Sequence, residues 1–180
     1  MINLQRIMII GRPGSGKSTF SVMLQKSLNI PLFHLDKYFF IADWMPREYE
    51  DFLSLQKELV AKPCWIIDGN SSKSFEIRYR EADMCLYFNL PKWLCYWRVF
   101  KRLFYKASEI DDRAAGCNET VRWSLLSYMW NYEQRINPLL NVLRNQYPKV
   151  KFIELRSPYD VAHLMRVLTH KEEYSIVTGF

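Results

Sequence analysis

The segment MIIGRPGSGKSTF, residues 8–20, places glycines, a proline, a lysine and hydroxyl side chains directly behind an apolar run. The spacing of Gly11, Gly16, Lys17 and Ser18 fits the G-x-x-x-x-G-K-[ST] pattern of a phosphate-binding loop in full. Glycine suits such a loop because it allows the backbone to come very close to an anion. The segment therefore predicts a binding site for a nucleoside triphosphate.

The sequence on either side of the loop has the context that the pattern requires. The residues before it are typical of a short strand, and a helix is expected from Lys17 because Phe20, Leu24 and Leu28 recur four residues apart. Lys17 would reach the β- and γ-phosphates, and Ser18 would offer its hydroxyl to Mg²⁺. The predicted ATP-binding residues in this loop are Gly11, Arg12, Pro13, Gly14, Ser15, Gly16, Lys17, Ser18 and Thr19.

Length and composition favour one globular domain over residues 1–180. Apolar residues make up 49% of the chain, which excludes a disordered protein, and no apolar run approaches the length of about 18 residues that a membrane span needs. The apolar start runs directly into the phosphate loop, so it is not expected to be a cleaved signal. Cys64, Cys85, Cys95 and Cys117 lack paired spacing, which indicates reduced thiols in a cytoplasmic protein without a membrane partner.

A net charge of +6 has two explanations, affinity for nucleic acid or an arginine-lined pocket for polyphosphate. The distribution of the basic residues favours the pocket. Arg98 and Arg102 lie one helical turn apart, Arg113 follows in a polar segment, and Arg135 is expected at the end of a helix. Such cations would offset charge on a transferred phosphoryl group. The aromatic residues beside the arginine pair, Trp93, Trp97, Phe100 and Phe104, favour core packing.

Strand and helix signals alternate along the chain, which predicts an α/β doubly wound parallel sheet with ligands at the carboxyl ends of its strands. Strands are expected at Arg6–Ile10, Pro31–Leu35, Cys64–Asp68, Met84–Asn89 and Val150–Leu155. Helices are expected from near Pro46, over Lys92–Lys106 and over about Asn118–Tyr132. A break or kink is expected further along, at Asn137–Pro138, and the SPYD motif, residues 157–160, begins the last helix. Residues 170–180 fit a frayed tail or a late edge strand.

Carboxylates stand at the ends of two expected strands. Asp68 ends the third strand, where it would assist Mg²⁺ beside the phosphate loop, although an aspartate before a glycine is also common in turns. Asp36 ends the second strand, where it would bind or deprotonate a phosphoryl acceptor. A structural pair between His34 and Asp36, or a helix cap, is an equally good interpretation.

The stretch LYFNLPKWLCYWRVFKRLF, residues 86–104, resembles the adenylate-kinase-like group of P-loop kinases. Within that group, HLDKYFF, WIIDGNSS, IRYREAD and GCNET resemble the DNA topology modulation proteins (FlaR-related). This resemblance implies a three-layer P-loop fold with a five-stranded parallel sheet in the order 2-3-1-4-5. It also implies an acceptor-binding segment at about 36–62 and a short lid at about 106–120.

The same resemblance implies roles for individual residues. Arg98 would lie against the adenine, Arg102 would touch phosphates, and Arg113 or Arg135 would come from the lid. Arg78 would face the acceptor. His34, Asp36 and Asn70, near the ends of the second and third expected strands, are the other predicted acceptor-binding residues.

Two functions follow from the sequence. The first is an ATP- and Mg²⁺-dependent kinase that phosphorylates a small acceptor, such as a nucleotide or nucleoside. The alternative is a nucleotide-binding modulator of DNA topology with little or no kinase activity, for which the basic net charge is the compositional support.

Overall fold

The computed structural model describes residues 4–39, 45, 47–104 and 123–177. Five parallel strands form one sheet in the order β2-β3-β1-β4-β5, which confirms the predicted fold and strand order. The strands are β1 (Arg6–Gly11), β2 (Leu32–His34), β3 (Trp65–Asp68), β4 (Met84–Phe88) and β5 (Lys151–Leu155). All the expected strands are therefore present, and none of their ends is shifted by more than one residue.

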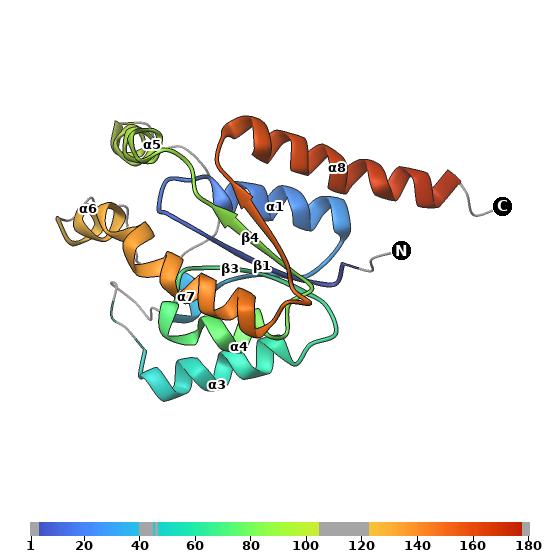
Figure 1. Cartoon of the computed structure of the whole chain (residues 1–180), viewed down its shortest axis with the longest axis horizontal. Helices are drawn as coiled ribbons and strands as arrows, with labels where there is room; N and C mark the ends of the chain where they lie inside the picture. Colours follow the sequence, from blue (N-terminus) through green and yellow to red (C-terminus); the bar gives the residue numbers. More distant parts are fainter. Residues whose placement is uncertain (1–3, 40–44, 46, 105–122, 178–180) are drawn as a thin grey trace.

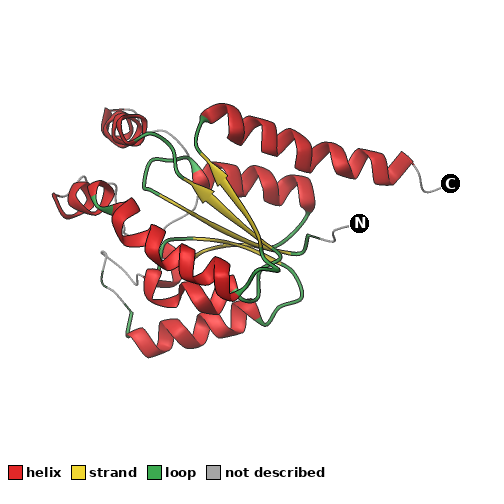
Figure 2. Ribbon diagram, in the orientation of Figure 1, coloured by secondary structure: helices red, strands yellow, loops and turns green. Residues whose placement is uncertain are grey.

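Helices cover both faces of this sheet and give the molecule three layers (Figures 1 and 2). The described helices are α1 (Lys17–Leu28), α2 (Leu35–Phe39), α3 (Tyr49–Val60), the 3-10 turn η1 (Ser72–Ser74), α4 (Phe75–Tyr79), α5 (Lys92–Phe104), α6 (Trp123–Trp130), α7 (Tyr132–Gln146) and α8 (Pro158–Val177). Helices α1 and α8 lie on one face, and α3, α4 and α7 lie on the other (Figure 1). None of the helices within the described ranges is both long and apolar enough to cross a bilayer.

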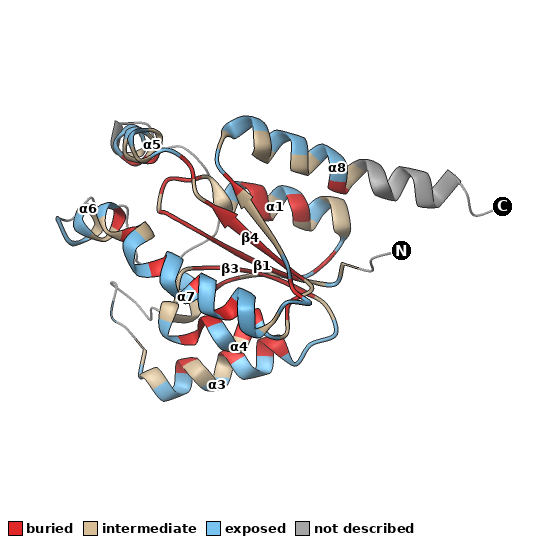
Figure 3. Ribbon diagram, viewed as in Figure 1, coloured by how far each residue is buried: buried red, intermediate tan, exposed pale blue. Residues whose placement is uncertain are grey.

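The hydrophobic core lies on both sides of the central strand β1. Ile7 and Ile9 point into the apolar cluster beneath α1 and α8, while Met8 and Ile10 point into the cluster beneath α3, α4 and α7. All of these side chains are fully buried, and Figure 3 shows the buried strands between helices whose outer faces are exposed. This is the pattern of a parallel strand covered on both faces, and it explains why the apolar runs in the sequence are continuous.

The strand register brings the candidate site together. Ile9 of β1 and His34 of β2 both stand opposite Asp68 of β3, and Gly11 stands opposite Phe88 of β4. The carboxyl ends of the central strands therefore meet where the phosphate loop leaves β1, the position at which ligands bind in open α/β sheets.

Three expectations about the helices were wrong. Asp36 lies within the short helix α2 rather than at the end of a strand. Helix α7 continues through Pro138, and the interruption comes earlier, at Asn131 between α6 and α7. The proline removes one backbone donor, and its partner would have been the carbonyl of exposed Gln134, which can face water instead. The third is the expected core packing of the aromatic residues of α5, because Trp93, Trp97 and Phe100 are exposed.

The helix predicted to start near Pro46 begins at Tyr49 in the structure, as α3. The C-terminal residues through Val177 continue helix α8, so neither a frayed tail nor an edge strand describes them.

A capping box starts α8, as the SPYD motif predicts. The backbone N–H of Asp160 donates to Ser157 Oγ at 3.1 Å, and the N–H of Ser157 donates to Asp160 Oδ2 at 2.9 Å. We expect Ser157→Ala to lower the free energy of unfolding by about 1 kcal/mol, because one N-terminal donor of the helix loses its partner. Urea denaturation measures this loss. Ser124→Ala, an exposed serine of α6, is the control, and an equal change in both variants would contradict the capping role.

Candidate functional site

The phosphate loop has the backbone conformation that an anion site needs. Gly14 and Gly16 adopt positive φ angles of 79° and 89°, and Gly16 is the left-handed N-cap of α1. The N–H of Ser15 donates to the carbonyl of Arg12 at 3.1 Å, which closes the turn. The free N–H groups of the first helical turn therefore stand at the positive end of α1, an arrangement that binds phosphate.

A charged cluster lies directly beside the loop. Lys17 Nζ is 3.9 Å from Asp68 Oδ1, and His34 Nδ1 is 3.0 Å from Asp68 Oδ2. Burial by itself would raise the pKa of Asp68, but Lys17, His34 and Ser18 together lower it below its ordinary value. Asp68 is therefore an ionised carboxylate with only 4% of its surface exposed.

Asp68 also has the properties of a metal ligand. Its Oδ1 is buried and has no hydrogen-bond partner in the described part of the chain, and the hydroxyl of Ser18 is close enough to lower its pKa. No group of three His, Cys, Asp or Glu side chains within the described ranges could hold a metal ion. One carboxylate and one hydroxyl fit Mg²⁺, which takes few protein ligands and completes its shell with phosphate oxygens and water.

Helix α5 packs directly on the phosphate loop. Arg98 donates from Nη1 to the carbonyl of Ser15 at 3.0 Å, so the structure brings the first of the two predicted arginines to the loop. Buried Cys95 and Val99 pack on the loop from the same side of the helix. Arg102 lies one turn further along α5 and is partly buried.

The outer side of α5 corrects the expectation of core packing. Trp93 is 71% exposed, Trp97 is 56% exposed and Phe100 is 43% exposed. The side chain of Phe104 lies outside the described residues. Periodicity alone could not separate the two sides of this helix, because both carry large apolar residues.

Four predicted ligand-binding side chains are engaged within the protein instead, and one of them is His34, which is buried and paired with Asp68. Arg12 is 1% exposed and points away from the phosphate side of the loop, toward α6 and α7. Arg78 is fully buried and donates to the carbonyls of Gly69, at 3.0 Å, and Ser71, at 2.9 Å. Asn70 uses its carboxamide to hold Gly11.

Burial lowers the pKa of Arg78 to about 10, with small opposing contributions that include Asp68 and Asp36. Arg78 therefore remains a cation at neutral pH, and its side chain is closed off from solvent. It shapes the turn after β3 by binding two of its carbonyl oxygens.

Two predicted residues lie where an acceptor could approach the sheet end. Asp36 is exposed on α2, immediately after β2. Arg135 lies in the first turns of α7 rather than at a helix end, and its guanidinium stands 5.0 Å from the centre of the Tyr128 ring. The expected lid, with Arg113, and part of the acceptor-binding segment (40–44 and 46) lie outside the described residues.

Sequence reasoning missed Tyr132 and Glu133, which reach the loop from the start of α7. Tyr132 donates to Asn70 Oδ1 at 2.9 Å, and Glu133 pairs with Arg12. No motif marks these residues, because their partners are more than fifty positions away in the chain. The only available signal was the Tyr132–Ile136–Leu140 spacing of a buried helix face.

Comparison with known proteins supports the fold. No protein-family model matches the sequence, and no curated protein is recognisably similar to it in sequence. Shikimate kinase from Bacteroides thetaiotaomicron superposes with a TM-score of 0.55 at 15% identity, covering 94% of this chain and 99% of that one. Shikimate kinase from Acinetobacter baumannii, in complex with shikimate, has a TM-score of 0.52 at 15% identity, covering 96% and 95%. The chain therefore shares the fold of these shikimate kinases, a three-layer α/β fold with a five-stranded parallel sheet.

Proposed function

We propose that this protein is an ATP-dependent kinase that transfers the γ-phosphoryl group to a small acceptor. The observation that carries the proposal is the cluster at the loop. An anion-binding helix N-terminus, the Lys17 ammonium and a buried Asp68 carboxylate stand within one site, and the Asp68 Oδ1 accepts no hydrogen bond from the described part of the chain. In-line phosphoryl transfer needs mainly such positioning and charge stabilisation.

The residues divide into three roles. The loop amides and Lys17 hold the triphosphate, while Arg98 and Arg102 offset charge that develops during transfer. Ser18 and Asp68 would hold Mg²⁺, which supplies charge neutralisation on the phosphate oxygens when it is bound. Lys17 already balances Asp68 in the protein, so the site holds no unpaired buried charge before the ligand arrives.

For the acceptor, we propose a hydroxyl compound that meets Asp36, with a nucleotide or nucleoside as the leading class. Support comes from the exposed carboxylate in the first turn of α2 and from Arg135 in the first turn of α7, which would suit an anionic group on the same molecule. A cytoplasmic location belongs to this proposal, since Cys64, Cys85 and Cys95 are all free thiols.

An acceptor screen tests the proposal. The full chain is incubated with Mg·[γ-³²P]ATP and a panel of nucleosides, nucleotides and shikimate, and labelled products are separated from free phosphate. Transfer to one class of acceptor supports kinase activity. Release of free phosphate alone across the whole panel would contradict it.

Asp36→Asn should separate the acceptor site from the ATP site. We expect kcat to fall by about 10²- to 10⁴-fold, the usual contribution of a general base, while the Kd for Mg·ATP stays within about twofold. Steady-state kinetics and calorimetry measure the two effects. Asp51→Asn, an exposed aspartate in the first turn of α3, is the matched control. Equal kcat values for the two variants would remove Asp36 from the reaction.

A second candidate function has one specific observation in its favour. Lys101 Nζ lies 5.0 Å from the centre of the exposed Trp97 ring on α5, and Trp93 is exposed one turn earlier. Aromatic rings beside cations bind single-stranded nucleic acid by stacking and charge. This protein would then be a nucleotide-binding modulator of DNA topology.

Titration with a fluorescent single-stranded DNA at increasing salt tests this candidate. Several phosphate contacts would give a log–log slope of about −0.7 per contact, and stacking on α5 would make Trp97→Ala bind more weakly. Absent or salt-independent binding would exclude it.

A further inference from the structure

We propose that Asn70, Tyr132 and the ion pair of Arg12 with Glu133 form a loop brace, which holds the entrance of the phosphate loop in its nucleotide-binding shape. The proposal rests on the function proposed above, because it assigns positioning residues to the same ATP site. These side chains come from the turn after β3, the loop itself and the first turn of α7, and they meet at the first two loop residues, Gly11 and Arg12.

In the first part of the loop brace, the carboxamide of Asn70 makes the hydrogen bonds that a backbone peptide group would make. The N–H of Gly11 donates to Asn70 Oδ1 at 3.0 Å, and Asn70 Nδ2 donates to the carbonyl of Gly11 at 2.7 Å. The backbone pairing of β1 with β3 ends at the residue before Asn70, where the N–H of Gly69 donates to the carbonyl of Ile9. The carboxamide of Asn70 therefore continues the sheet pairing onto the first residue of the loop.

Tyr132 adds a third hydrogen bond to that carboxamide. The Gly11 N–H can only donate and the Gly11 carbonyl can only accept, so these two groups fix the orientation of the Asn70 side chain. The Tyr132 hydroxyl donates to the same Oδ1 at 2.9 Å. Tyr132 is 1% exposed, and burial raises its pKa well above the ordinary value. The phenol thus stays protonated and remains a donor at any physiological pH.

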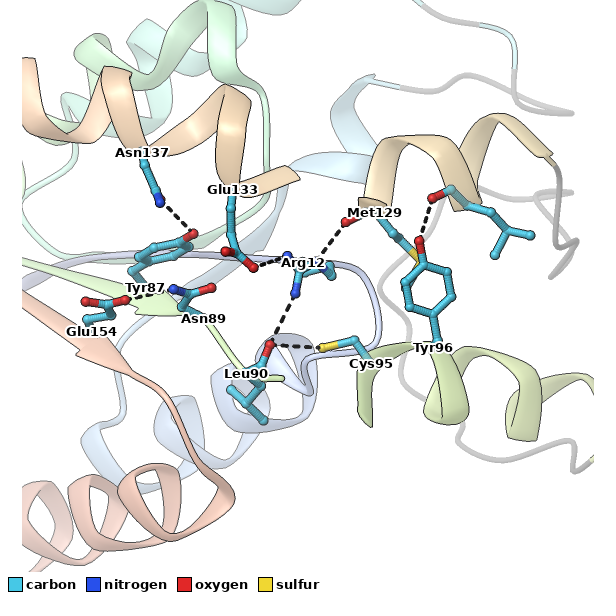
Figure 4. Close-up of polar contacts among 11 residues, drawn as sticks. Arg12, Tyr87, Asn89, Leu90, Cys95, Tyr96, Met129, Glu133, Asn137 and Glu154 are labelled. Carbon is cyan, nitrogen blue, oxygen red and sulfur yellow. Dashed lines mark hydrogen bonds and ion pairs between the residues drawn. The ribbon is translucent and has the colours of Figure 1, made fainter. Parts of the chain in front are cut away.

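Arg12 anchors the next residue of the loop. Its Nε donates to the carbonyl of Met129 at 2.8 Å, its Nη1 donates to the carbonyl of Leu90 at 3.2 Å, and its Nη2 pairs with Glu133 (Figure 4). The buried cation is therefore compensated by a carboxylate and two carbonyls. Two consecutive loop residues, Gly11 and Arg12, are tied to elements that follow much later in the chain.

The contacts of Gly11 and Arg12 preorganise the phosphate loop for its ligand. The carbonyl of Arg12 accepts the N–H of Ser15, so the position of Arg12 sets the turn that presents the following amides to the phosphates. A loop held in its bound shape loses less conformational entropy when the ligand arrives. Loosening the loop brace should therefore weaken Mg·ATP binding without touching any group that contacts the ligand.

Tyr132→Phe tests this with the smallest change, because it removes only the hydroxyl and keeps the ring. Tyr87→Phe is the matched control: it keeps the ring, whose centre stands 6.4 Å from that of Tyr132, and removes only a hydroxyl that donates to Asn137 of α7 at 3.0 Å (Figure 4). Loss of one such hydrogen bond corresponds to about a 2- to 13-fold change in an equilibrium. Calorimetry with Mg·ATP should show Kd rising about 3- to 10-fold in Tyr132→Phe and less than twofold in Tyr87→Phe, at a temperature where both are folded.

Amide hydrogen exchange of the protein without nucleotide gives a second, independent measurement. We expect the Gly11 amide, relative to that of Leu86 in β4, to exchange about 10-fold faster in Asn70→Ala and to be unaffected in Tyr87→Phe. Unchanged exchange in Asn70→Ala, or an unchanged Kd in Tyr132→Phe, would overturn the loop brace. If the wild-type protein binds no Mg·ATP, the proposed function fails, and the exchange rate alone then decides the loop brace.

Discussion

Replacement of Lys17 by methionine is expected to lower kcat/KM on the order of 10²- to 10³-fold, the usual effect of removing one preorganised group that stabilises developing charge. Lys17 is the first residue of α1, and its ammonium already stands 3.9 Å from the carboxylate of Asp68, at the sheet end where the triphosphate would lie. Without it, the γ-phosphoryl group would lose one of the cations proposed to stabilise it, while the loop amides, Arg98, Arg102 and Mg²⁺ would remain.

Kinetics with Mg·ATP and the acceptor found in the screen measure the effect. Lys26→Met is the matched control, because Lys26 is an exposed lysine in the last turn of the same helix and should leave kcat/KM within about twofold. Circular dichroism should show that Lys17→Met remains folded. Normal turnover by this variant would move the nucleotide site away from the loop altogether.

The same variant should also change how stability depends on pH. In the wild-type protein the pKa of Asp68 is lowered from 3.8, so its ion pairs stabilise the fold above that pH, and this stabilisation is lost as the pH falls through the lowered value. Lys17 is the largest influence that lowers this pKa, and burial opposes it. We therefore expect Lys17→Met to lower Tm at pH 7 and the deficit to shrink as the pH falls below 3.8. A deficit independent of pH would contradict the coupling.

The parts of the fold that were predictable from sequence are those with local causes. The loop, the buried strands and the capping box at Ser157 each follow from residues within a few positions of one another. The strand order came from the family resemblance, and no local pattern in the chain encodes it. Family membership in the FlaR-related group gained no support from the comparisons, whereas the P-loop kinase fold did.

What could not be predicted depends on partners far away in the chain. Arg12 lies within the phosphate-loop pattern, yet its side chain donates to the carbonyl of Met129 and pairs with Glu133, more than a hundred residues later. Arg78 looks like a ligand-binding cation, but it is buried against the turn after β3. A motif identifies where the backbone goes, whereas the direction of a long side chain is decided by tertiary contacts that spacing does not encode.

Gly14→Ala is the variant expected to damage the fold most. Gly14 has a φ of +79°, and a Cβ at this position would lie 2.3 Å from the carbonyl oxygen of Cys95 and 2.9 Å from Val99 Cγ2. The left-handed backbone alone costs about 1–2 kcal/mol for a residue with a side chain. The clash involves backbone of α5, so relief requires the helix to move away from the loop. We therefore expect the free energy of unfolding to fall by about 3 kcal/mol or more.

Gly16→Ala separates the two causes. Gly16 has a similar φ of +89°, but a Cβ there would meet only Arg98 Nη1, at 3.3 Å, which is the end of a flexible side chain. This variant should lose only about 1–2 kcal/mol, the conformational part of the effect. Urea denaturation of both proteins isolates the packing of α5 on the loop as the difference between them. Equal losses would mean that α5 does not pack tightly on the loop. The proposed role of Arg98 in stabilising charge at the loop would then lose its structural basis.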